Sequence, residues 1–192
     1  MVVEGENPFH YTGVHAFGFL EGAEGRPDGV MGALRDLGAP PDGPVIWAGS
    51  FVGDYAGLVH VRVDEGRLGD LQDLISGDLF DRGFRGRWAI EARPAPKKDS
   101  GTAALFVGVK RGTQEVIAIS ALRVQPGMLD RVLQDAQAIS TFRGASVVFG
   151  KADVLLQLGA ADLATVATSV EAEVQALEGI TSASTAFCDG SR

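Results

Sequence analysis

Seven side chains in the first half of the sequence have chemistry suited to binding or transforming a small molecule. They are His15, Trp47, Tyr55, His60, Arg62, Arg85 and Arg87. An imidazole exchanges protons around neutral pH because its unperturbed pKa is about 6.5. A guanidinium pairs bidentately with planar anions, and aromatic rings can complete a pocket. The set predicts a site for a small anionic or carboxylate metabolite, with His60 as the acid–base group if the site is catalytic.

Side-chain alternation along strands predicts that several of these groups share one sheet face. In the expected strand 58–63, valines alternate with His60 and Arg62, so the valines would face the helices and the polar residues the opposite side. The same pattern over 84–91 sets two arginines opposite the aromatic residues. The open face is therefore expected to carry His15, His60, Arg62, Arg85 and Arg87 in the first half, and Ser120 and Gln157 in the second.

Structural roles account for the same residues, and the sequence leaves both interpretations open. Arginines pair with acids across sheet interfaces, and the basic stretch 82–98 has the composition of a solvated strand edge followed by a charged linker. A single histidine on a strand, such as His60, is commonly a hydrogen-bonded structural residue. Tyr55 lies beside Asp54 in a segment that fits a solvated turn as well as a ligand contact.

Composition and charge argue against several classes of function. A formal net charge of -8 opposes sequence-independent binding of nucleic acid, which needs a concentrated basic surface. No apolar run approaches the roughly 20 residues of a membrane-spanning helix. Residues 1–10 lack the basic start and the apolar stretch of an export signal. We therefore expect a cytoplasmic protein with neither nucleic-acid nor membrane partners.

Metal and haem chemistry lack the side chains that they need. Cys188 is the single cysteine, so no intrachain disulfide can form, and a zinc ion would need three other ligands beside it. Residues 25–29 have the Gly-x-x-Asp-Gly spacing of dye-decolourising haem peroxidases, but no histidine lies in the second half to ligate a haem. The same absence weighs against the chlorite dismutase group. We expect neither a metal nor a cofactor.

Similar features recur in the two halves of the chain. Helical patterns over 27–36 and 126–135 both carry a proline in the first turn, where a helix tolerates it. Hairpin patterns around Gly53 and Gly150 follow runs rich in β-branched and aromatic residues. A second helix and a final strand follow in each half. The order strand-helix-strand-strand-helix-strand is typical of the ferredoxin-like unit.

The repeat predicts the fold class and the division of the chain. Both helices of each unit would cover one face of its sheet, so the other face needs a partner, which the second copy supplies. We predict an α+β fold in which two ferredoxin-like βαββαβ repeats pack sheet to sheet as a pseudo-dimeric α+β barrel. The first repeat is expected over 11–92, a linker over 93–103 and the second repeat over 104–188, with an extra strand at 104–110.

Three segments of the second half, Val124-Gln-Pro-Gly-Met, Gly150-Lys-Ala-Asp-Val-Leu-Leu-Gln-Leu and Leu177-Glu-Gly-Ile-Thr, resemble the ligand-binding (RAM) domain of the Lrp/AsnC regulators. The first half keeps the hairpin glycine as Gly53 but has Ala56 at the position of the family's aspartate. The resemblance implies a ferredoxin-like ligand-binding domain. Only about 12 residues precede the first expected strand, so we expect no counterpart of the family's helix-turn-helix domain. A relation to the wider dimeric α+β barrel superfamily fits equally well.

These observations favour a non-catalytic module that binds a small molecule or regulates or assembles with a partner, without a DNA-binding domain. The alternative is a cofactor-independent enzyme of the monooxygenase or cyclase type, with its pocket around His15, Trp47 and His60. A third interpretation is a purely structural subunit. A homo-oligomer, if one forms, would use the sheet edges.

Overall fold

The computed structural model describes residues 13–20, 27–38, 43–64, 68–96, 102–103 and 115–189. The first half comprises β1 (Val14–Leu20), α1 (Pro27–Arg35), β2 (Val45–Ser50), β3 (Val52–Gly53), β4 (Gly57–Val63), α2 (Leu68–Ser76), α3 (Asp78–Asp81) and β5 (Gly86–Pro96). After β6 (Thr102–Ala103), the second half comprises β7 (Val116–Val124), α4 (Leu129–Ala136), β8 (Phe142–Gly150), β9 (Val154–Ala160), α5 (Leu163–Ser169), a π-helical turn (Val170–Val174) and β10 (Ile180–Asp189).

Local sequence explains where the helices lie and which side of each is buried. In α4, Val132, Leu133 and Ala136 recur at helical spacing and are buried against the sheet. Helix α5 begins after its N-cap residue Asp162, whose side chain accepts a hydrogen bond from the backbone N–H of Thr165. None of the helices in the described ranges is long and apolar enough to cross a membrane.

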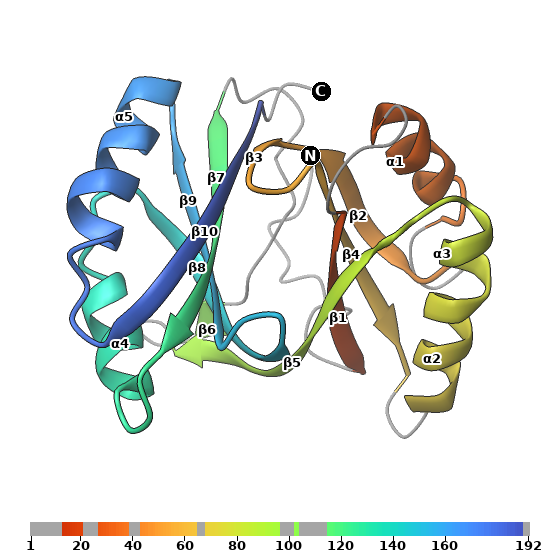
Figure 1. The fold of residues 1–192 in the computed structure, drawn as a ribbon, viewed down its shortest axis with the longest axis horizontal. Helices are drawn as coiled ribbons and strands as arrows, with labels where there is room; N and C mark the ends of the chain where they lie inside the picture. The colour runs from red at the N-terminus through yellow and green to blue at the C-terminus, as the bar shows by residue number, and fades with distance from the viewer. Residues whose placement is uncertain are drawn as a thin grey trace, which may run out of the picture.

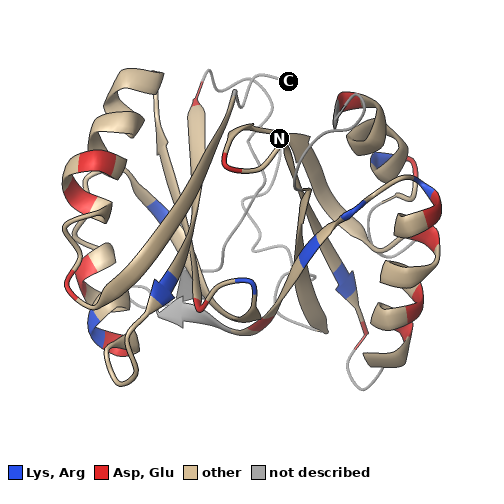
Figure 2. Cartoon of the chain, in the orientation of Figure 1, with Lys and Arg blue, Asp and Glu red and all other residues tan. Residues whose placement is uncertain are grey.

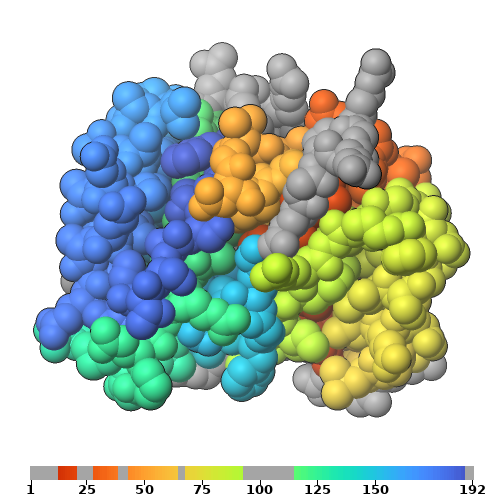
Figure 3. Space-filling model, viewed as in Figure 1, coloured from red at the N-terminus to blue at the C-terminus, as the bar shows by residue number. Residues whose placement is uncertain are grey.

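The two halves form two sheets that face each other, with the helices outside (Figure 1). The strands follow the order β2-β4-β1-β5-β8-β9-β7-β10-β3, so β5–β8 and β3–β10 are the two seams between the halves. Because β2 and β3 are separated by Phe51 alone, the ends of this order adjoin and the sheets close into a barrel. Figure 3 shows the segment around β3 lying against the second half. The predicted pseudo-dimeric α+β barrel is confirmed.

Two glycines at matching positions make the seams. Gly53 lies opposite Ala186 of β10, and Gly150 lies opposite Ala89 of β5. Both have positive φ values, 138° and 118°, which side chains disfavour. A Cβ on Gly150 would lie 2.4 Å from the Trp88 carbonyl oxygen, and one on Gly53 would lie 2.7 Å from that of Thr185. The hairpin glycines of the repeat therefore let each half pair with the other's last strand.

Three buried clusters hold the barrel together. One cluster lies under the helices of each half, and the third lies between the sheets. We call the sheet face that looks toward the other half the inner face. The inner faces meet through Phe17, Phe19, Phe51, Tyr55, Leu58, Ala89, Ile117, Ile119, Ala121, Val148, Ala152, Leu155, Ala186 and Cys188. Most of the space between the halves is thus an apolar core.

Three details differ from the sequence-based expectations or lie beyond what the structure describes. Strand β5 continues through Pro96, into the segment expected to be a linker, and a shift in register between Glu91 and Arg93 accommodates the proline-containing end. The extra strand expected at 104–110 lies outside the described residues, as do residues 25–26 of the Gly-x-x-Asp-Gly segment. Charged residues concentrate on the outer helices, whereas the strands carry few (Figure 2).

Candidate functional site

Two histidines form a hydrogen-bonded pair on the inner face of the first half. His15 on β1 and His60 on β4 are 5% and 2% exposed, and His15 Nδ1 lies 2.9 Å from His60 Nε2. In either tautomer one of these nitrogens donates the hydrogen and the other accepts it. We call His15 and His60 the imidazole pair. The pair can hold one added proton between the rings, whereas two would set two cations in contact.

Aromatic rings surround the imidazole pair. Phe17 stacks on His60 with ring centres 4.4 Å apart. Trp47 on β2 lies opposite His60 in the strand register, is half-buried and packs against the inner cluster. Its indole lies over Gly49, since a Cβ there would be 2.3 Å from the ring. His15 and His60 are therefore brought together, as the alternation of the strands predicts, and Trp47 lies beside His60 in the register. Their binding role stays a prediction.

Arg62 lies beside the imidazole pair. It is opposite His15 in the pairing of β1 with β4, and its side chain is 13% exposed. Its guanidinium reaches Asp64 Oδ1 at 3.3 Å, and that carboxylate is 69% exposed. An exposed ion pair of this kind contributes little stability. Arg62 thus sets a fixed positive charge at one edge of the pair.

The expected position of Arg85 on the open face is wrong. Strand pairing starts only at Gly86, so Arg85 belongs to the turn after α3 and does not follow the strand alternation. Its guanidinium carbon lies 3.3 Å from the centre of the Phe80 ring, and Nη1 donates to the Phe80 carbonyl. Arg87 shares the inner face with Ala89 but is exposed, opposite Phe19. Neither guanidinium joins the buried imidazoles.

Tyr55 is a buried bridge between the halves. Its hydroxyl donates a 2.6 Å hydrogen bond to the carbonyl oxygen of Ile119 on β7, and its ring contacts Phe19 edge-on. Burial raises the pKa of the Tyr55 hydroxyl well above its usual value, and Cys188 and Asp54 add to the shift. Tyr55 therefore stays protonated and packed, which favours a structural role over the solvated turn.

The inner face of the second half differs from expectation at one of two positions. Gln157 shares its face with Leu155 of the inner cluster and is buried there, as expected. Ser120 shares its face with Ala118 and Leu122, which pack under the helices, so its expected position is wrong. Its hydroxyl lies 2.7 Å from that of Thr185. The strand 116–124 is apolar on both sides, so alternation could not identify its inner face.

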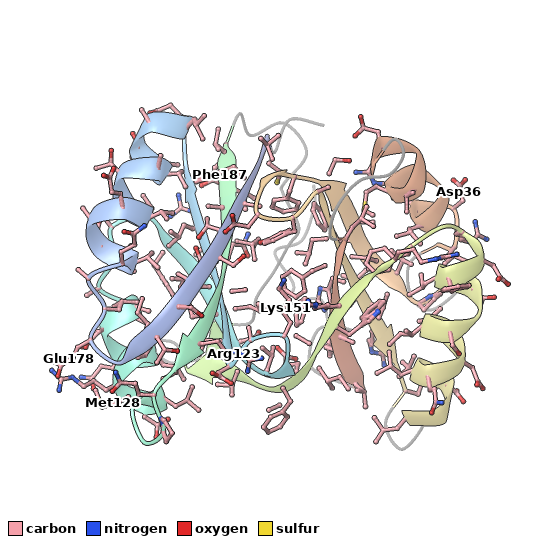
Figure 4. The ribbon with its side chains drawn as sticks, viewed as in Figure 1. Asp36, Arg123, Met128, Lys151, Glu178 and Phe187 are labelled. Carbon is pink, nitrogen blue, oxygen red and sulfur yellow. The ribbon has the colours of Figure 1, made fainter. Side chains whose placement is uncertain are left out.

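Two polar groups that the sequence did not single out also reach the space between the sheets. Glu91 on β5 shares the inner face with Ala89 and accepts a 2.6 Å hydrogen bond from the buried Ser146 hydroxyl of β8. Lys151 lies between the two layers in Figure 4, with its ammonium nitrogen 5.7 Å from the centre of the Phe19 ring. Glu91 falls in the predicted strand 84–91, at an alternate position from Ala89, so strand parity could have identified it.

A separate surface pocket lies on the outer side of the first half. It measures about 360 Å³ and is lined by Pro44, Val63, Asp70, Asp73, Leu74 and Asp78. Val63 belongs to the face opposite His60, so this pocket is distinct from the imidazole pair. Within the described part of the chain, no three His, Cys, Asp or Glu side chains gather so as to hold a metal ion.

Comparison with known proteins adds little beyond these observations. No protein family model matches the chain, and no curated protein is similar to it. A crystal structure described as a putative monooxygenase from Fusobacterium nucleatum aligns with 93% of each chain, at 8% identity and a TM-score of 0.49. A mutant chlorite dismutase from Candidatus Nitrospira defluvii covers 92% of this chain and 91% of its own, at 12% identity and the same TM-score. Likeness at this level carries no functional conclusion, so function is argued from the residues.

Proposed function

We propose that this chain is a general acid–base enzyme of the cofactor-independent monooxygenase or cyclase type, with the imidazole pair as its proton-transfer group. The supporting observation is the buried hydrogen bond between His15 and His60 on the inner face of an α+β barrel. Titratable groups in a buried setting are candidates for acid–base catalysis, because proton transfer needs a group that changes charge near the working pH.

The imidazole pair has the properties of a base. A substrate with an acidic C–H or O–H bond would give its proton to an imidazole nitrogen, and the bonding electrons would stay on the substrate as an anion. The positive charge left on the pair is shared across the hydrogen bond between the rings. Trp47, which is half-buried beside the inner cluster, offers an apolar face to a flat substrate. A cyclase would use the substrate anion in an internal attack, and a monooxygenase would let it react with dioxygen.

The positions of the arginines favour proton transfer over simple anion binding. An anion site needs fixed cations directed at one point. Arg85 stacks on Phe80 instead, Arg87 is exposed, and Arg62 pairs with Asp64. His15 and His60, by contrast, are withdrawn from water and lie against each other. Buried side chains that can change their charge therefore dominate the candidate site.

Deuterium exchange tests this proposal without knowledge of the natural product. The protein in D₂O is incubated with a panel of 1,3-dicarbonyl compounds and phenols, and deuterium uptake at carbon is followed by NMR. We expect catalysed exchange in the wild type, its loss in His60→Ala, and its retention in Gln157→Ala, the matched change in the other half. Exchange that persists in a folded His60→Ala protein would sink the proposal.

The second candidate is a non-catalytic binding or regulatory module, favoured by the apolar packing between the halves and by the likeness of the second half to the RAM domain. Such a module needs no change of charge inside the barrel. Native mass spectrometry of protein purified from its own cells distinguishes the two candidates. A small molecule retained unchanged, together with no deuterium exchange on the panel, would favour binding.

A further inference from the structure

The inner face of the first half carries a row of three charged or titratable residues on adjacent strands. Arg62 on β4 lies opposite His15 on β1. Glu91 on β5 lies two residues beyond Ala89, and Ala89 is opposite Phe17. Side chains two residues apart on a strand share a face, so Glu91 is on the same side of the sheet as His15. We call Arg62, His15 and Glu91 the charged row.

The equivalent strands of the second half indicate which residue of β5 lies nearest to His15. There Ala186 lies opposite Ile119, as Ala89 lies opposite Phe17, and two residues on Cys188 lies opposite Ile117. In the first half the β1–β5 pairing ends one step earlier, at Ala16 opposite Ile90, so Glu91 lies just beyond its end and on the same face as His15. Residues directly opposite across antiparallel strands have Cβ atoms about 5 Å apart, and side chains one step beyond the last pair remain close neighbours. A carboxylate in such a position acts on the charge of the imidazole pair without a direct hydrogen bond.

We propose that Glu91 is the charge partner of the imidazole pair, a positioning residue that favours its protonated form, and that Ser146 from the other half holds the carboxyl in place. Ser146 is fully buried, and its hydroxyl donates to Glu91 Oε1 across the β5–β8 seam. One half thus supplies the imidazoles and the acid, and the other supplies the hydroxyl that orients the acid. The catalytic meaning of this role rests on the proposed function, whereas the electrostatic coupling does not.

The setting of Glu91 is consistent with this role. Burial raises the pKa of the Glu91 carboxyl, and the hydrogen bond from Ser146 partly offsets that rise. The carboxyl is therefore withdrawn from water on the inner face, and the Ser146 hydroxyl fixes its position there. The equivalent position in the other half is Cys188, and that of Ser146 is Gly49, which offers no hydroxyl.

Other charged groups near the barrel interior oppose protonation of the pair or are already matched. The described titratable and charged side chains on these elements are Arg62, Arg87, Lys151, Tyr55, Cys188, Asp54 and the ion pairs Arg123–Asp153 and Arg143–Glu115. The cations Arg62, Arg87 and Lys151 disfavour an imidazolium. Asp54 accepts from the Thr185 backbone N–H at the opposite seam. Asp64 is paired with Arg62, and among the described acids Glu91 shares the inner face with His15, one residue beyond the last β1–β5 pair.

NMR titration of the imidazole rings tests the coupling. Ring signals of His15 and His60 are followed from pH 5 to 9 in the wild type, Glu91→Gln and Cys188→Ser, with assignment by single histidine variants. We expect Glu91→Gln to lower the apparent pKa of the pair by about one unit, since it removes a nearby negative charge. Cys188→Ser, the matched change in the second half, should leave the titration unchanged. A shift below about 0.2 unit in folded Glu91→Gln would overturn the proposal.

Two further variants decide the matter if Glu91→Gln does not fold. Glu91→Asp withdraws the carboxylate by one methylene, and Ser146→Ala removes the hydrogen bond that holds it, so each should alter the titration of the pair. Unchanged titration in both overturns the proposal. Deuterium exchange separates the two ideas: lost exchange in His60→Ala without any coupling to Glu91 keeps the proposed function, and coupling without exchange keeps only the electrostatic role.

Discussion

The two inner faces are built on one backbone plan, yet they differ in polarity. Phe17 has His60 and Ala89 as its neighbours, and the equivalent Ile119 has Gln157 and Ala186. At the next inner-facing position of each strand, the first half has the ionisable residues Arg62, His15 and Glu91. The equivalent residues of the second half are Gly159, Ile117 and Cys188. The second half thus contributes apolar or neutral side chains where the first contributes ionisable ones. A repeat preserves strand pairing, which needs only backbone, while side chains at equivalent positions are free to diverge.

The halves also differ in the size of equivalent side chains. Tyr55 in the first hairpin packs over the inner face of the second half, where the strand offers Ile119 and the small Ala121. At the matching position of the second hairpin stands Ala152, and Phe19 stands where the second half has Ala121. The first half therefore contributes the larger side chain at both pairs of equivalent positions, and Tyr55 fills space between the halves.

The largest expected effect comes from removing the bulk at Tyr55. Tyr55→Ala leaves a cavity between the halves and the Ile119 carbonyl without its donor, so we expect a loss of about 3–5 kcal/mol in the free energy of unfolding. Urea denaturation measures it. Tyr55→Phe keeps the ring and should lose only about 1–2 kcal/mol. Equal losses in the two variants would contradict the idea that the Tyr55 ring fills space between the halves.

The next effect concerns the seams. Gly150→Ala sets a methyl group against the Trp88 carbonyl at a positive φ, so we expect a loss of about 2–3 kcal/mol. Gly53→Ala meets a similar obstacle, but β3 contributes only two residues to its seam. Strand β3 should detach locally more easily than β8, so we expect Gly53→Ala to lower the free energy of unfolding by only about 1–2 kcal/mol. Thermal unfolding of both variants checks the order, and a greater loss at Gly53 would reverse this view of the seams.

A smaller effect is expected when the inner face of the first half is made more like that of the second by replacing His60 with glutamine. The second half already buries a glutamine, Gln157, at the position equivalent to His60. In His60→Gln the new side-chain amide can donate to His15 Nδ1, so we expect the free energy of unfolding to fall by only about 0.5–1.5 kcal/mol. Chemical denaturation gives the value, and deuterium exchange on the same sample should be abolished. If stability fell by as much as in Tyr55→Ala, His60 would be a packing residue first.

The smallest effect is a pH dependence of stability. Because burial raises the pKa of Glu91 in the folded state above its usual 4.5, the folded protein binds this proton more tightly, and stability falls as pH rises from about 4.5 through the folded pKa. Glu91→Gln removes that loss, so its stability relative to the wild type should rise between pH 4 and pH 7, by less than about 1 kcal/mol.

Denaturation at several pH values measures this slope, and Ser146→Ala is its matched variant. The Ser146 hydroxyl lowers the pKa of Glu91, so its removal should steepen the loss of stability with pH. A flat difference between Glu91→Gln and the wild type across this range would show that the carboxyl titrates as it does in water.

Strand parity predicted much of the candidate site, but only where a strand alternates. It set His60 and Arg62 opposite the valines of β4, and those valines pack under the helices. It failed at Arg85, which precedes the first paired residue of β5, and at Ser120, whose strand is apolar on both faces. The hydrogen bond between the imidazoles joins residues 45 positions apart, and no local pattern encodes such a contact.

The sequence by itself determined the repeated unit, because helix periodicity, hairpin glycines and strand alternation are all local signals. It also determined that the ionisable groups lie in the first half. Only the tertiary structure decided which of them meet. Register between β1 and β4 brings His15 to His60, the β1–β5 pairing sets Glu91 on the same face as His15, and the seam with β8 brings Ser146 to Glu91. Such contacts depend on how distant strands align, which no single strand specifies.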